Sequence, residues 1–178
     1  YILVVLCLSL LVIVLANTSM NVALPTMAHD LQLTTSSMQW VVDSYALVFA
    51  GLLFTAGTLG DRFGRKGFLQ AGLVVFGLGS VYATWLAHTS GELIGARAVM
   101  GLGGALVMPT TLSILVNTFP ARERAKAIAI WSGIAGVGGA VGLALGGWLV
   151  EHFWWGSTFA INLPVCALAL VAGGLLLP

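Results

Sequence analysis

The sequence predicts an all-α membrane protein with six membrane-spanning helices. Three observations lead to this fold class: hydrophobic residues make up 59% of the 178 residues, charged residues make up 7%, and the few charges separate long uncharged runs. A soluble domain carries about 25% charged residues, so this composition argues against a soluble enzyme. The net charge of +1 indicates neither a nucleic-acid partner nor an acidic one.

Each predicted helix corresponds to one largely uncharged run. A spanning helix needs about 20 apolar residues, and the runs predict helices near residues 2–24, 38–60, 67–88, 93–118, 126–149 and 157–177. The first run is longer than the apolar region of a signal peptide, about 7–15 residues, and it has no basic flank. We therefore expect it to be a helix of the bundle.

The basic residues predict how these helices are oriented. Six of the seven fall in two alternate loops: Arg62, Arg65, Lys66, Arg122, Arg124 and Lys126. The positive-inside rule places such loops in the cytoplasm, and the N-terminus would then be cytoplasmic too. Five of the six tryptophans fall near the predicted outer ends, where aromatic belts form.

The loop after the second predicted helix combines glycines, one acid and three bases. Residues 57–66 read GTLGDRFGRK. Charges at neighbouring helix ends can pair and can complement the helix dipoles, and glycines permit tight turns and close packing. We expect a conformational latch made of Gly57, Asp61, Arg62, Gly64, Arg65 and Lys66. A loop that only sets the membrane orientation is the alternative.

Two charged residues lie inside predicted helices. Arg97 lies about one turn into the fourth helix, and Asp43 is the only acid well inside a span. Ser36 and Gln39 have capping-box spacing, so we expect the second helix to begin near Ser37, which places Asp43 about 9 Å along it. Ionisable residues at membrane depth are candidate functional residues. Proton exchange at Asp43, a fixed ion pair between Asp43 and Arg97, and snorkelling of Arg97 to the headgroups all remain open.

Small residues mark a close-contact face on the fifth predicted helix. Gly138, Gly142 and Gly146 form two overlapping G-x-x-x-G units, and Gly147 lies beside them. Such faces let helix backbones approach closely. Static packing and a moving contact are both consistent with this pattern.

Polar and flexible residues on the first and fourth predicted helices suggest a cavity. We expect it to be lined by Asn17, Thr18, Asn21, Met100, Met108 and Pro109. Irregular backbone at membrane depth is tolerated where it lines such a cavity. Hydrogen bonding between helices is the alternative role for the polar members. No residue pattern indicates a metal site, a phosphate-binding loop or a catalytic triad, so we expect neither metal nor catalysis.

Several of these stretches resemble a known family. The loop GTLGDRFGRK resembles the signature loop of the major facilitator superfamily, and LIGARAVMGLGGA at 93–105 resembles its helix-four motif. NVALP at 21–25 and WVVDSY at 40–45 are similar to the fourteen-span drug:proton antiporters, above all to the branch that exports quaternary ammonium compounds. The resemblance implies that residues 1–178 are the N-terminal six-helix bundle of a longer transporter in the cytoplasmic membrane.

The same resemblance implies proton-coupled efflux of amphipathic or cationic small molecules by alternating access. A proton gradient would supply the energy without a cofactor. The partners would be the bilayer, a C-terminal half and a small substrate, with no nucleic acid. Ala16 and Leu143 stand where the family usually has Asp and Pro, so Asp43 with Arg97 is the expected proton-coupling site. Export of a native lipid or metabolite, and a non-transporting sensor or scaffold, remain the alternatives.

Overall fold

The computed structural model describes residues 1–177, and six stretches are long and apolar enough to span a membrane. They are α1 (Ile2–Asp30), α2 (Thr35–Phe63), α3 (Arg65–Val81) with the π-helical turn η1 (Tyr82–Leu86), α4 (Ser90–Thr118), α5 (Ala121–His152), and α6 (Ser157–Ala160) with α7 (Asn162–Leu176). No strand occurs within residues 1–177. The predicted all-α fold with six spans is confirmed.

The first helix is longer than the sequence predicts. It continues through Pro25 and ends at Asp30, not near residue 24. A proline inside a helix removes the hydrogen bond to the carbonyl four residues earlier, here that of Asn21, but the rest of the ladder can remain. The N–H of Leu31 closes the last turn on the carbonyl of Met27 at 2.9 Å.

The helices α2 to α5 all begin earlier than predicted, and caps explain this for α2 and α4. The N-cap of α2 is Thr34, whose hydroxyl accepts the N–H of Ser37 at 3.1 Å, so the predicted capping box that starts at Ser36 is wrong. In α4 a capping box joins Thr89 to Glu92, and the helix begins at Ser90. Arg97 therefore lies about two turns into α4 rather than one.

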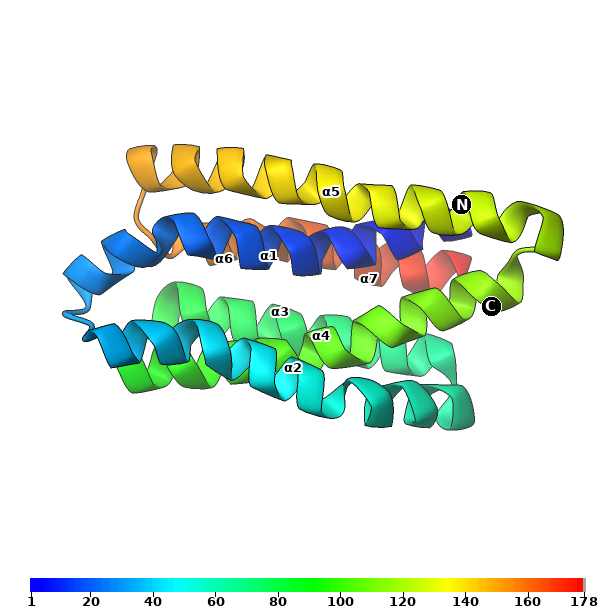
Figure 1. Cartoon of the computed structure of the whole chain (residues 1–178), viewed down its shortest axis with the longest axis horizontal. Coiled ribbons are helices and arrows are strands. Elements are labelled where there is room, and N and C mark those ends of the chain that lie inside the picture. The colour runs from blue at the N-terminus through cyan, green and yellow to red at the C-terminus, as the bar shows by residue number, and fades with distance from the viewer. Residues whose placement is uncertain (178) are drawn as a thin grey trace.

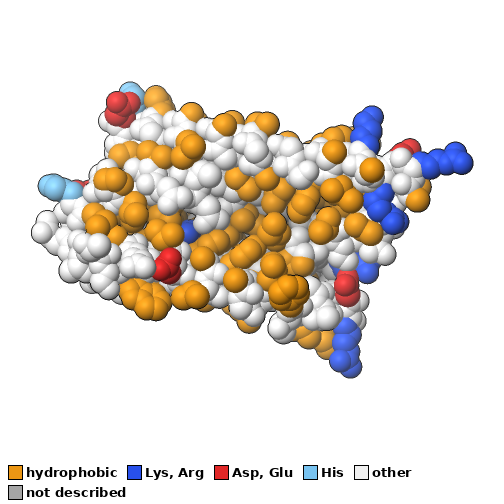
Figure 2. Space-filling view, in the orientation of Figure 1, with side chains coloured by type: hydrophobic (Ala, Val, Ile, Leu, Met, Phe, Trp, Pro, Cys, Tyr) orange, Lys and Arg blue, Asp and Glu red, His pale blue; other side chains and the backbone are white. Residues whose placement is uncertain are grey.

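The helices form two layers. In Figure 1, α1, α2, α4 and α5 lie toward the viewer, and α3, α6 and α7 lie behind them. Both ends of the chain lie at the same end of the bundle as the α2–α3 and α4–α5 connections. Figure 2 shows the lysines and arginines gathered at this end, while apolar side chains cover much of the face between the two ends.

Glycines allow α4 to lie very close to its neighbours on both sides. A Cβ atom at Gly101 would lie 2.6 Å from the carbonyl oxygen of Tyr45 in α2, and one at Gly103 would lie 2.6 Å from the backbone nitrogen of Phe76 in α3. No other residue fits at such distances without a backbone shift. This packing fixes the rotation of α4 about its axis and so directs Arg97 into the bundle.

Candidate functional site

Arg97 occupies a fully buried position where α1, α2 and α4 meet. Its side chain is 1% exposed. The Nε–H donates to the carbonyl of Val41 at 3.2 Å, and Nη2 donates to Oδ1 of Asn17 at 3.1 Å. The guanidinium carbon lies 4.4 Å from the ring centroid of Tyr45, within the range of a cation–π interaction. The expectation that Arg97 snorkels to the headgroups is therefore wrong.

Asp43 lies two residues from each of the α2 residues that contact Arg97, Val41 and Tyr45. Asp43 itself forms no ion pair with Arg97. Within residues 1–177 the ion pairs are His29–Asp30 and Asp61–Arg65. The fixed ion pair between Asp43 and Arg97 is thus absent from this structure. Asp43 is half-buried, and Nη1 of Arg97 has no hydrogen-bond partner among the described residues. The Asp43 carboxylate therefore has no ion pair among the described residues, and the facing helix α4 carries one arginine donor without a hydrogen-bond partner.

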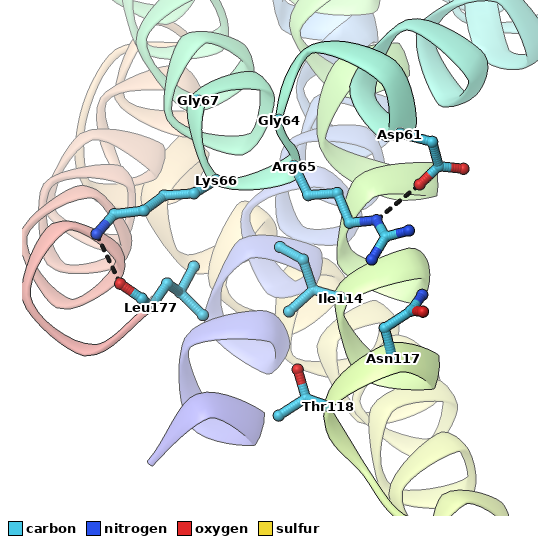
Figure 3. Close-up of a pocket in the computed structure, with 9 residues that line it drawn as sticks. All are labelled: Asp61, Gly64, Arg65, Lys66, Gly67, Ile114, Asn117, Thr118 and Leu177. Atoms are coloured by element: carbon cyan, nitrogen blue, oxygen red, sulfur yellow. Dashed lines mark hydrogen bonds and ion pairs between the residues drawn. The ribbon is translucent and has the colours of Figure 1, made fainter.

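The charged residues predicted to lie in a loop after α2 lie instead at the end of α2 and the start of α3, and they form a network at the end of the bundle that carries the basic side chains. Arg65 donates through Nε to Oδ1 of Asp61 at 2.7 Å, and the hydroxyl of Ser113 donates to the same oxygen at 2.6 Å. Lys66 donates to the carbonyls of Gly174 and Leu177 at 3.1 and 2.6 Å. Figure 3 shows Arg65 and Lys66 reaching in opposite directions from the start of α3. The network joins α2, α3, α4 and α7 around a pocket of about 460 Å³.

The other residues expected in the latch have simpler roles in this structure. Gly64 has a φ of +113°, a conformation that favours glycine, and it makes the sharp turn between α2 and α3. A Cβ at Gly57 would lie 3.4 Å from Cβ of Pro109. Arg62 is exposed, and its guanidinium carbon lies 5.5 Å from the ring centroid of Phe63.

The glycine face of α5 packs directly on α1. A Cβ at Gly146 would lie 2.8 Å from Cα of Ser19, and one at Gly142 would overlap the hydroxyl of Thr18. A Cβ at Gly138 would lie 2.8 Å from a methyl group of Leu11. The spacing therefore predicts the close contact correctly, and the structure identifies α1 as its partner.

The residues expected to line a cavity divide into separate groups. Met108 and Pro109 line an apolar groove of about 270 Å³ between α2, α4 and α5, together with Leu53, Phe54, Gly57, Leu112 and Trp131. Asn17 belongs to the Arg97 cluster, Thr18 packs against α5, and Asn21 is exposed with its amide bonded to the Asn17 carbonyl. Met100 is wholly buried against Gly79 of α3, so its expected place in a cavity is wrong.

Comparison with known proteins identifies the family. The family described as Major Facilitator Superfamily matches residues 6–178. The chain belongs to the major facilitator superfamily. The fold agrees: the bundle superposes on the proton:xylose symporter XylE with a TM-score of 0.81 at 17% identity, over 97% of this chain and 43% of that one. With six spanning helices, this member of the major facilitator superfamily is a multi-pass membrane protein.

Relatives within the superfamily are much longer than this chain. It is 42% identical to the multidrug efflux pump LfrA of Mycolicibacterium smegmatis over 98% of this chain and 34% of LfrA. It is 39% identical to the methyl viologen resistance protein SmvA of Salmonella typhimurium over 83% of this chain and 30% of SmvA. It is 34% identical to the riboflavin transporter RibZ of Clostridioides difficile over 99% of this chain and 39% of RibZ. The chain thus spans about a third of the length of these major facilitator proteins.

Sequence reasoning missed several partners in this major facilitator bundle. Tyr45 shares one face of α2 with Val41, four residues earlier, but neither was predicted to contact Arg97. Ser113 lies near the C-terminal end of α4, whereas Arg97 lies near its start. Nothing in the sequence around Ser113 marks it as a partner of Asp61. The Val41 and Leu177 acceptors are backbone carbonyls, which carry no signature in side-chain sequence.

Proposed function

We propose that this chain is the N-terminal half of a proton-coupled exporter of amphipathic or cationic small molecules in the cytoplasmic membrane. The end that carries the basic loops and both ends of the chain would face the cytoplasm. LfrA and SmvA are described as a multidrug efflux pump and a methyl viologen resistance protein, and each matches more than four fifths of this chain. A C-terminal half would complete the transport path, and the proton gradient would supply the energy without a cofactor.

The single observation that supports proton coupling is the arrangement of Asp43 and Arg97. Arg97 is buried with one open donor, and Asp43 lies on the facing helix without an ion pair. An unpaired carboxylate at membrane depth is costly unless it is hydrated or protonated. We propose that Asp43 binds a proton when the cavity is open to one side and releases it to water when the cavity is open to the other, where the Arg97 charge would stabilise the carboxylate that remains.

The remaining features fit a cycle of alternating access around this site. The Asp61 network would hold the cytoplasmic side closed against the other half and release it during the cycle. The groove lined by Met108 and Pro109 lies on the layer formed by α1, α2, α4 and α5, and it would form one wall of the substrate path, together with Asn17 and Asn21. The contact of Gly138, Gly142, Gly146 and Gly147 with α1 would be the surface along which α5 shifts.

A transport assay with the complete polypeptide tests the proposal. Proteoliposomes would be given a proton gradient, and the movement of ethidium and of protons would be recorded together. We expect gradient-dependent ethidium movement that carries protons in the opposite direction. Ethidium movement that does not depend on the gradient would contradict proton coupling, and no movement of any tested substrate would support a non-transporting sensor.

A second candidate function is export of a native metabolite on the same scaffold. Its support is the 34% identity with a protein described as a riboflavin transporter over 99% of this chain. Competition in the same proteoliposomes separates the two functions. Riboflavin should leave ethidium movement unchanged if the leading proposal holds, whereas inhibition by riboflavin, with transport of labelled riboflavin itself, would favour the metabolite.

A further inference from the structure

A second cavity lies between α3 and α4, where the two layers of helices meet. It is a groove of about 420 Å³ between α3 and α4, lined mostly by apolar side chains that include Leu78, Tyr82 and Val99. These three side chains are 61%, 38% and 42% exposed. Apolar groups so exposed on a spanning helix face the hydrocarbon of the bilayer. The α3 side of this groove belongs to the rear layer (Figure 1), whereas the groove lined by Met108 and Pro109 lies between α2, α4 and α5.

One carboxylate lies at the end of this groove that is far from the basic loops. Glu92, near the start of α4, lines the groove. Its Oε2 accepts the backbone N–H groups of His88 and Thr89 at 2.8 and 3.1 Å. Its Oε1 accepts no hydrogen bond within residues 1–177. Arg97, the basic residue of α4, points into the bundle toward Val41 and Asn17 and forms no ion pair with this carboxylate.

The shape of α3 leaves the groove open. The helix becomes π-helical at Tyr82–Leu86, directly beside the groove, and π-helical turns frequently lie near functional sites. Across the groove, α4 presents Gly95, where an added Cβ would meet no atom within 4 Å. The groove thus combines an apolar trough with a negative charge at its headgroup end.

We propose that this groove binds lipophilic cations that have partitioned into the bilayer, with the apolar body between α3 and α4 and the charged head beside Glu92. Charge complementarity selects this occupant: an anion would be repelled by Glu92, and an uncharged molecule would gain nothing from it. The site goes beyond the proposed function, because it is a different groove from the one proposed as a wall of the substrate path, and its test measures binding without transport.

The test uses the complete protein in nanodiscs of phosphatidylcholine, with two matched fluorescent probes. The cationic probe is trimethylammonium-diphenylhexatriene, and the neutral one is diphenylhexatriene. We expect saturable binding of both, with the cation bound more tightly. Glu92→Gln should weaken the cation about two- to five-fold, as for an exposed charge pair, and leave the neutral probe unchanged. Glutamine can keep the capping box, so the fold is preserved.

Two glycine substitutions give a matched test of the groove itself. Gly95→Leu should fill the groove and abolish saturable binding of both probes. Gly77→Leu is the control, because Gly77 also lies inside a helix with no atom within 4 Å of an added Cβ but does not line the groove. It should leave both affinities unchanged. Both variants replace glycine in a helix interior, so their helix-propensity effects match.

Three outcomes would overturn the proposal. Equal cation binding by the Glu92→Gln variant and the unmodified protein would remove the carboxylate from the site. Unchanged binding in the Gly95→Leu variant would place the probes elsewhere. Loss of cation binding on adding phosphatidylethanolamine would identify a membrane amine lipid as the occupant. Asp43→Asn should not alter groove binding, so failure of the transport proposal and failure of this one are distinguishable.

Discussion

Two charged networks tie the helices of this bundle together, and they do so in opposite ways. The Arg97 cluster is buried and holds a cation with a carbonyl, an amide and an aromatic ring but no carboxylate. The Asp61 network is exposed and holds a carboxylate with a direct basic partner four residues later. Buried polar groups that lose their partners are costly, whereas exposed ion pairs contribute little to stability. We infer that the buried cluster fixes the fold and the exposed network can open without unfolding it.

The largest expected effect on stability comes from removing the buried cation. Arg97→Ala deletes two hydrogen bonds between helices, each contributing up to about 1.7 kcal/mol in a membrane, and a desolvated cation–π contact of about 2 kcal/mol. We expect a loss of about 3–5 kcal/mol, measured by reversible unfolding of the complete protein in detergent micelles. A loss below about 1 kcal/mol would show that the cluster does not hold the three helices together.

A pair of smaller changes compares one hydrogen bond from each network. Asn17→Ala removes the acceptor of the buried Arg97 bond and should cost about 1–2 kcal/mol. Ser113→Ala removes a donor to the exposed Asp61 carboxylate and should leave the melting temperature unchanged. The same unfolding measurement compares the two variants directly. If both variants lose the same free energy of unfolding, the buried and exposed networks do not differ in their contribution to stability.

The Asp61 network should affect movement more than stability. Asp61→Asn keeps the shape of the side chain but removes the charge that pairs with Arg65. We expect an unchanged melting temperature, unchanged substrate binding and a transport rate reduced several-fold, because a latch between the two halves is weakened. Glu123→Gln, another acid at the same end, is the control and should transport normally. Normal transport by the Asp61 variant would remove its latch role.

The sequence predicted the fold well because hydrophobic length determines membrane spans almost by itself. Six runs gave six spans, and the cluster of charges predicted at neighbouring helix ends contains the ion pair between Asp61 and Arg65. Helix ends were less accurate, because the hydroxyl of Thr34 competed with that of Ser36 for the cap position, and a single proline did not stop α1. The surroundings of Arg97 could not be predicted, because they depend on the rotation of α4, which glycine contacts with α2 and α3 determine.

Asp43 combines a small expected effect on stability with the largest expected effect on coupling. Because Asp43 forms no ion pair in this structure, Asp43→Asn should change stability by less than about 0.5 kcal/mol, as surface substitutions do. The amide cannot bind and release a proton, so substrate movement should no longer carry protons. The check records ethidium and proton movement together in proteoliposomes. Poor folding rescued by neutralising Arg97 as well would instead reveal an ion pair formed in another state of the cycle. Unimpaired proton movement would exclude Asp43 as the carrier, and the open donor of Arg97 would then have to face an acid in the other half.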